Sequence, residues 1–122
     1  MFNIDPTLEL ISRGLDACTL RQAVYSANVA NVNTPGYRPQ EVEFDAQLRA
    51  AAQAVSGEPL DQQTAVLESV KPSVVPSAAP SVEVDQQLAL MSENAIRYDT
   101  LLNAYEKSMG LLRLAIQQGK NG

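Results

Sequence analysis

The sequence contains no histidine, and Cys18 is its only cysteine. A structural zinc site takes several ligands from Cys and His, and a nucleophilic Cys–His or Ser–His pair needs an imidazole base. Neither can be built from these residues, so we expect no enzyme activity, no cofactor and no metal site. A single thiol cannot form an intrachain disulfide, and it therefore does not indicate the redox compartment.

Other signals are also missing. The net charge is −5 and the nine basic residues are scattered, whereas nucleic-acid binding needs a basic patch. No apolar run approaches the roughly 20 residues that cross a bilayer. Residues 1–6 lack the basic and apolar regions of a Sec signal peptide. We expect no nucleic-acid partner, no small-molecule substrate and no cleaved signal, so the chain stays inside or leaves through another export machine.

Aromatic residues are absent between Gly57 and Val84, where four of the seven prolines lie. Prolines do not join a regular hydrogen-bond ladder, and few large side chains are present to be buried. The composition predicts a flexible, extended middle segment over residues 49–84, in which residues 57–84 are mobile and cut first by protease. Its single short strand possibility involves Val66, Leu67 and Val70.

The longest pattern in the chain is an apolar ladder over residues 85–118. Apolar side chains alternate at steps of three and four, the repeat of a helix that lies along another helix. Such a helix is roughly 51 Å long at about 1.5 Å per residue. Asp85 can cap its start, and Gly119 provides a stop signal. The ladder consists of Leu88, Met91, Ala95, Tyr98, Leu102, Tyr105, Met109, Leu112 and Ile116.

A second ladder with the same spacing predicts a helix from Pro6 to Val32, capped by Asp5. One of its positions is polar, Gln22, which can fix the register of two packed helices. Cys18 is best interpreted as a small buried hydrophobic residue. The ladder consists of Leu8, Ile11, Leu15, Cys18, Gln22, Tyr25, Val29 and Val32.

These patterns predict a mostly α protein in which the N- and C-terminal helices pair as a coiled-coil hairpin. One rod domain is built from both chain ends. Its three regions are an N-terminal helix with an Asn-rich turn (1–48), a Pro/Ser-rich flexible middle segment (49–84) and a C-terminal heptad helix (85–122).

Residues 27–38 form an unusually long helix stop. Three asparagines lie within six residues, and each lowers helix propensity. Thr34 precedes a proline, which disfavours the helical conformation. Pro35-Gly36 then has the pattern of a type II turn, so we expect a positive φ at Gly36.

Acidic residues alternate with Val42 and Phe44 after this turn: Glu41, Glu43 and Asp45. Paired carboxylates can act as an acid–base pair or bind a hard cation. No glycine turn or oxygen-ligand spacing supports a calcium loop, so a solvated strand edge or helix start is favoured. Residues 46–54 can extend a short helix.

Two stretches carry a family resemblance: Ala27-Asn28-Val29-Ala30-Asn31-Val32-Asn33-Thr34-Pro35-Gly36-Tyr37-Arg38 and Glu41-Val42-Glu43-Phe44. The first resembles the signature of the bacterial flagellar axial proteins. The second is similar to an acidic-hydrophobic sequence specific to their basal-body proximal rod protein B family. The segments 91–98 and 110–116 resemble the terminal helix of that family. The resemblance covers roughly residues 6–48 and 84–118. It names as motif residues Asn28, Asn31, Asn33, Thr34, Pro35, Gly36 and Tyr37.

The resemblance implies a structural component of the proximal rod, the drive shaft that crosses the periplasm in the flagellar basal body. Relatives are synthesised in the cytoplasm and exported by the flagellar type III apparatus without signal cleavage. They assemble with themselves and other rod subunits, and the base of the rod meets the inner-membrane ring and the export gate.

The alternative from the helical patterns alone is a coiled-coil adaptor or an export-related helical binding protein. The seam expected to carry assembly is Leu8, Ile11, Leu15, Tyr25, Val29, Leu88, Met91, Tyr98, Leu102, Tyr105, Met109, Leu112 and Ile116.

Overall fold

The computed structural model describes residues 6–121 and confirms a mostly α fold. Its elements are α1 (Pro6–Ala30), β1 (Gln40–Glu43), α2 (Asp45–Ala54), α3 (Leu60–Ser69), β2 (Ser73–Pro76) and α4 (Val84–Asn121). The predicted cap at Asp5 lies outside the described residues.

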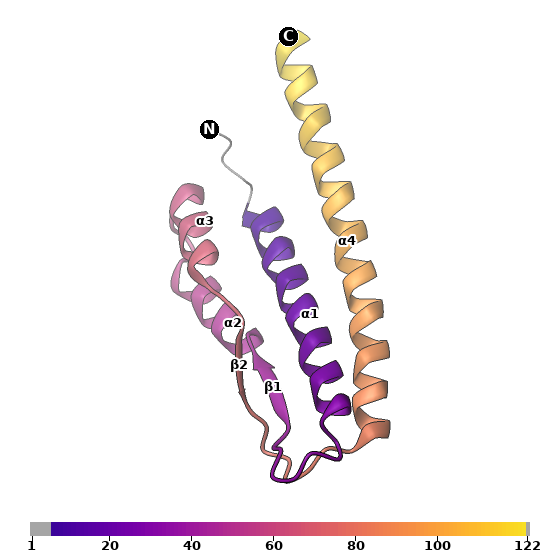
Figure 1. The fold of residues 1–122 in the computed structure, drawn as a ribbon. Coiled ribbons are helices and arrows are strands. Elements are labelled where there is room, and N and C mark those ends of the chain that lie inside the picture. The colour runs from indigo at the N-terminus through magenta and orange to yellow at the C-terminus, as the bar shows by residue number, and fades with distance from the viewer. Residues whose placement is uncertain (1–5, 122) are drawn as a thin grey trace.

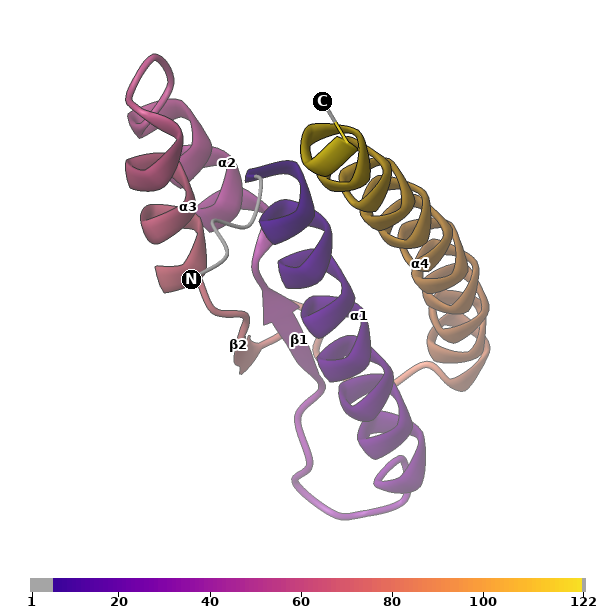
Figure 2. The same ribbon diagram turned by 90° about the horizontal axis from the view of Figure 1, so that it is seen from above.

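Helix α1 is the central element of the fold. Figure 1 and Figure 2 show α4 along one side of α1, with α2, α3 and the two strands on the other side. The two long helices run antiparallel, so the predicted pairing of the N- and C-terminal helices is confirmed. Because α4 is the longer helix, its C-terminal turns continue past the start of α1 (Figure 1).

The strands form a two-stranded antiparallel ribbon, in which Gln40 pairs with Pro76 and Glu43 with Ser73. The ribbon and α2 together bring Phe44 against α1. Ala17, Phe44 and Val70 form a small buried cluster, and Val42, Leu48 and Ala51 pack against it. The ribbon therefore places the short helices on the face of α1 opposite α4.

The prediction of an extended middle segment is wrong for residues 60–69, which form α3. This stretch contains neither proline nor glycine, and its Pro59 N-cap and Asp61 in the first turn are normal helix-start features. Leu67, one of the residues proposed for a strand, is buried in this helix, and Val70, just after it, is buried as well. The prolines of the middle segment lie outside residues 60–69, so they do not prevent a helix there.

The predicted ends of the long helices also differ from the structure. Helix α1 ends at Ala30, two residues before the predicted end at Val32, and α4 continues through Gly119 to Asn121. A glycine commonly ends a helix through a positive φ. Among the described glycines only Gly36 and Gly57 have one, so Gly119 provides no stop.

Candidate functional site

The side chain of Asn28 connects α1 to three other parts of the molecule. It is fully buried, with 0% of its surface exposed. Its Nδ2 donates to the carbonyl of Gln40 and to Oε1 of Gln87, both at 2.9 Å. Its Oδ1 accepts from the hydroxyl of Tyr37 at 2.8 Å and from the amide of Gln40 at 3.0 Å. An amide side chain has two donors and two acceptor positions, so all of its hydrogen-bonding capacity is used.

The turn that brings Tyr37 and Gln40 back to Asn28 has the predicted geometry. Gly36 has a φ of 77°, as expected from the Pro-Gly pattern. The amide of Tyr37 donates to the carbonyl of Thr34 at 3.2 Å, which closes the four-residue turn. The motif is thus a device that folds the chain back onto α1.

The other two asparagines of the motif have different environments. Asn31 donates from Nδ2 to the carbonyl of Ala27 at 2.8 Å and accepts from the Thr34 hydroxyl at 3.1 Å. It therefore satisfies a carbonyl at the end of α1. Asn33 is exposed, and the structure does not bring it into the Asn28 network.

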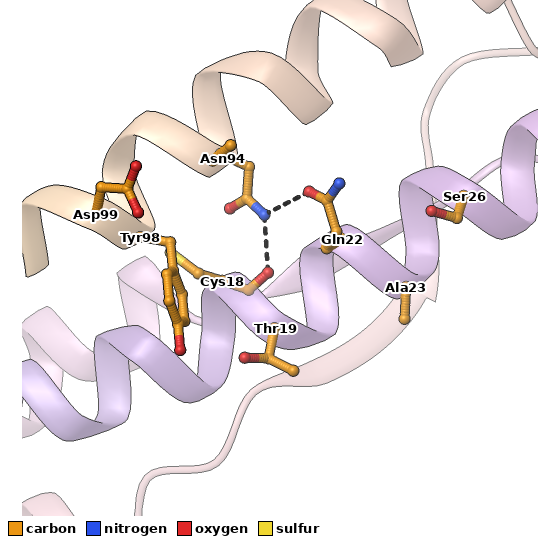
Figure 3. Close-up of a pocket in the computed structure, with 9 residues that line it drawn as sticks. Cys18, Thr19, Gln22, Ala23, Ser26, Asn94, Tyr98 and Asp99 are labelled. Carbon is orange, nitrogen blue, oxygen red and sulfur yellow. Dashed lines mark hydrogen bonds between the residues drawn. The ribbon is translucent and has the colours of Figure 1, made fainter. Parts of the chain in front are cut away.

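A second buried amide lies at the middle of the α1–α4 contact. Nδ2 of Asn94 donates to the carbonyl of Cys18 at 2.8 Å and to Oε1 of Gln22 at 3.0 Å, as Figure 3 shows. Asn94 is only 5% exposed. Its Oδ1 is also buried and has no hydrogen-bond partner. Gln22 thus occupies the helix interface, as its position in the ladder predicts.

The helices approach closely at Gly14. A Cβ atom placed there would lie 3.1 Å from Cδ1 of Leu101. The absence of a side chain at Gly14 therefore allows Leu101 to sit against the backbone of α1, which explains a glycine inside a helix despite its cost of about 1 kcal/mol.

The face of α4 that meets α1 is one residue out of step with the predicted ladder. Gln87, Asn94 and Leu101 contact α1 at heptad spacing, whereas the ladder begins at Leu88. Adjacent helical residues point about 100° apart, so the ladder is turned partly away from α1. Ala95 and Tyr98 of the ladder still line the groove between the two helices, and the role of the ladder as an assembly seam stays a prediction.

The seam residues are accordingly buried to different extents. Leu8 is buried, whereas Leu88, Tyr98 and Ile116 are 49%, 37% and 42% exposed. The remaining members are half-buried: Ile11, Leu15, Tyr25, Val29, Met91, Leu102, Tyr105, Met109 and Leu112. Among the α4 side chains that the structure describes, only those of Gln87 and Asn94 are buried.

Burial controls the acidity of two side chains next to this interface. Desolvation raises the pKa of the Cys18 thiol, although the positive charges of Arg21 and Arg97 oppose the shift. Burial raises the pKa of the Tyr25 phenol in the same way. Cys18 is free and buried, as expected for a small packing residue. A protonated, inaccessible thiol is a poor nucleophile.

The acidic residues after the turn do not gather into a site. Glu41 and Glu43 are exposed, and Oδ1 of Asp45 lies 2.9 Å from the guanidinium of the buried Arg21. Within residues 6–121, no group of three His, Cys, Asp or Glu side chains could hold a metal ion. None of the helices in this described range is long and apolar enough to cross a membrane.

An open groove of about 460 Å³ lies between α1 and α4 beside Asn94. Figure 3 shows Thr19, Gln22, Ala23 and Ser26 on its α1 side and Asn94, Tyr98 and Asp99 on its α4 side.

The sequence pattern does not predict the buried positions of Gln87, Asn94 and Arg21, because polar residues give no signal in an apolar ladder. Gln87 and Asn94 lie 14 and 7 residues before Leu101, and this heptad spacing is the one sequence signal that places the two amides on the same helix face as Leu101.

The comparisons with known proteins match the chain in the segment that contains Asn28 and Tyr37. A sequence model of a family described as flagella basal body rod protein matches residues 10–38, which include most of α1 and the turn. The chain is 23% identical to the flagellar basal body rod protein FlgB of Escherichia coli (strain K12), with 95% of this chain and 96% of the relative covered. It is 24% identical to FlgB of Bacillus subtilis (strain 168), with 93% and 95% covered. A shorter match to FlgB of Borrelia hermsii has 42% identity over 37% of this chain and 33% of the relative.

Proposed function

Because the chain belongs to the flagellar basal body rod protein B family, we propose that it is a subunit of the proximal rod that assembles with copies of itself and with other rod subunits through the exposed sides of α1 and α4. As a rod component it is a structural protein of the flagellar basal body.

The apolar surface of α4 is the observation that carries this proposal. Along this 38-residue helix, Leu88, Ile96, Tyr98, Leu111, Leu114 and Ile116 are exposed large hydrophobic residues. Water contact with so much apolar surface is unfavourable, at about 25 cal/mol per Å². Large exposed apolar surfaces usually mark interfaces. A bundle of neighbouring rod subunits would cover this surface over the whole length of the helix.

We further propose that the chain reaches the rod through the flagellar type III export apparatus without signal cleavage. The base of the assembled rod then meets the inner-membrane ring and the export gate. This part of the proposal is based on the sequence similarity to flagellar rod proteins. Within residues 84–119 no apolar side chain of α4 is buried in the chain itself, and this supports the proposal, because weakly packed helices separate readily before export.

Imaging of purified basal bodies that contain a labelled version of the chain tests the proposal. We expect the label in the rod, and we expect a strain without the chain to lack hooks and filaments but to keep its inner-membrane ring. A label found only in the cytoplasm, as a one-to-one complex with another protein, would instead support the coiled-coil adaptor.

A seam variant tests the assembly surface. Leu102 is half-buried in the free chain, and Leu102→Asp would place an unpaired charge in every subunit contact that covers it. We expect this variant to be exported but non-motile. Asn103→Asp introduces the same charge at an exposed neighbouring position and should swim almost normally. Motility of the Leu102→Asp strain would contradict the proposal that the seam is an assembly surface.

A further inference from the structure

The backbone groups of the two-stranded ribbon point to different sides at alternate residues. In an antiparallel pair, residues that exchange hydrogen bonds alternate with residues whose N–H and C=O point away from the partner strand. The amide of Ser77 donates to the carbonyl of Pro39 at 2.9 Å, and Gln40 lies opposite Pro76, which has no N–H. The odd-numbered residues of both strands therefore bond to each other, and the even-numbered residues direct their backbone groups to the two edges of the ribbon.

The edge of β1 is closed by a side chain. Nδ2 of Asn28 donates to the carbonyl of Gln40, and Oδ1 of Asn28 accepts from the amide of Gln40. The Asn28 amide thus makes the two bonds that a neighbouring strand would make to this residue. Val42, the next residue on this edge, is half-buried and packs against the small buried cluster. Figure 2 shows α1 alongside β1, so this edge is covered by α1.

The edge of β2 is exposed instead. Figure 2 shows β1 between β2 and α1, and Val74 is 42% exposed. The even-numbered positions in and next to β2 are Pro72, Val74 and Pro76. An added antiparallel strand needs both a donor and an acceptor at each of these positions. Because proline has no N–H, only Val74 provides both, and the edge cannot pair along its length.

We propose that Pro72 and Pro76 determine how copies of this chain associate, by preventing their β2 strands from pairing. Without the two prolines, two β2 strands can meet antiparallel about a twofold axis at Val74. Residue 72 of each copy then lies opposite residue 76 of the other, and all three edge positions exchange hydrogen bonds. Pairing of this kind is the usual hazard of an exposed strand edge, and proline is a common protection against it.

The inference goes beyond the proposed function, because it concerns the specificity of association. Assembling subunits are close together, and an open edge would compete with the helices for the neighbouring copy. A twofold strand pair uses the same surface on both copies and closes as a dimer. With Asn28 on one edge of the ribbon and prolines on the other, association is left to the helices.

Hydrogen exchange in the unmodified full-length chain, followed by NMR, tests the geometry. The amides of Val75 and Gln40 have hydrogen-bond partners in β1 and at Asn28, so we expect slow exchange at both. The amide of Val74 points to the exposed edge and should exchange at least about tenfold faster than that of Val75. Equal protection of Val74 and Val75 would show that the edge is already occupied and would overturn the inference.

Restoring the missing donors tests the role of the prolines. Pro72→Thr with Pro76→Thr returns an N–H to both positions. This double variant should sediment as a dimer at a dilution where the unmodified chain is monomeric, with association at least about tenfold tighter. The Val74 amide should become protected in this dimer. The matched control, Pro59→Thr with Pro80→Thr, changes two prolines outside the ribbon to the same residue and should stay monomeric.

A third substitution identifies the contact. Val74→Pro, added to the double variant, removes the central donor and leaves the bonds between β1 and β2 intact, because the Val74 amide points outward. It should return the protein to a monomer. Helicity measured by circular dichroism checks that every variant folds. A monomeric double variant, association of the control, or a dimer that persists with Val74→Pro would each overturn the inference, whereas basal-body imaging tests the rod proposal separately.

Discussion

Nδ2 of Asn28 donates to Oε1 of Gln87 at 2.9 Å, across 59 residues of sequence. This bond fixes the end of α1 against the first turns of α4. Since the same Asn28 side chain holds Tyr37 and Gln40, the return of the chain after α1 and the pairing of the long helices depend on one amide.

Replacement of Asn28 should therefore affect the whole hairpin. Asn28→Ala removes the partner of the buried Gln87 side chain and the part-buried hydrogen bonds to the backbone of Gln40, and we expect a loss of about 2–4 kcal/mol in the free energy of unfolding. Urea denaturation and the labelling rate of the buried Cys18 thiol measure the effect. The exposed Asn33 provides the control, since Asn33→Ala should change stability by less than about 0.5 kcal/mol. Equal effects of the two variants would contradict the role of the Asn28 network.

The Gly36 turn should tolerate only residues that accept a positive φ. Gly36→Val forces a β-branched residue to a φ near 77°, at a cost of about 1–2 kcal/mol or more. Gly36→Asn should be milder, because asparagine enters this region more readily. Thermal unfolding of both variants compares them. If valine and asparagine were equally tolerated, backbone strain would not be the constraint at this position.

Stability should fall in alkaline solution. The Cys18 thiol, with an ordinary pKa near 9.0, has a raised pKa in the folded protein. The unfolded chain then loses its proton first, so the contribution to stability is complete below the unfolded pKa and is lost as the pH rises toward the folded pKa. Tyr25 adds the same effect at higher pH, since its pKa is raised from 10.0.

Urea unfolding midpoints between pH 7 and 10.5 measure this trend. Cys18→Ala removes the first titrating group, so its midpoints should change less near pH 9 than those of the unmodified chain. A parallel decline in both proteins would show that another group is responsible.

Limited proteolysis should cut the loop between α2 and α3 first. Residues 56–59 are exposed, and Gly57 has a φ of 88°. Leu67 is 2% exposed, so we expect α3 to be cut later than this loop. The composition-based prediction that residues 57–84 are mobile implies early cuts throughout that segment instead. Mass spectrometry of the first fragments separates the two outcomes.

The sequence predicts the two long helices well because their apolar spacing is regular, and it predicts the turn because Pro35-Gly36 has specific backbone preferences. It does not predict which residues of α4 are buried against α1. The apolar ladder contains Leu88 and Tyr98, yet the buried positions are the amides of Gln87 and Asn94. Their burial depends on tertiary hydrogen bonds that periodicity does not describe.

Helix α3 was missed for a different reason. By composition residues 49–84 form one segment, and the prolines of this segment predict an extended chain. Within the segment, Leu60–Ser69 has good helix formers and the spacing of Thr64 and Leu67 for one buried face. The stability of such a short helix depends on the surfaces against which it packs, here α1 and α2.

The hydrogen bonds between the long helices also set an order of folding. Asn94 bonds to the carbonyl of Cys18 across 76 residues, whereas the strand pairs close much shorter loops. Contacts between distant residues form late, because closing a long loop costs more entropy. In a chain that emerges N-terminus first, from a ribosome or a narrow channel, the strands and the short helices can thus pack on α1 early. Helix α4 can pair with α1 only after the final third of the sequence has emerged.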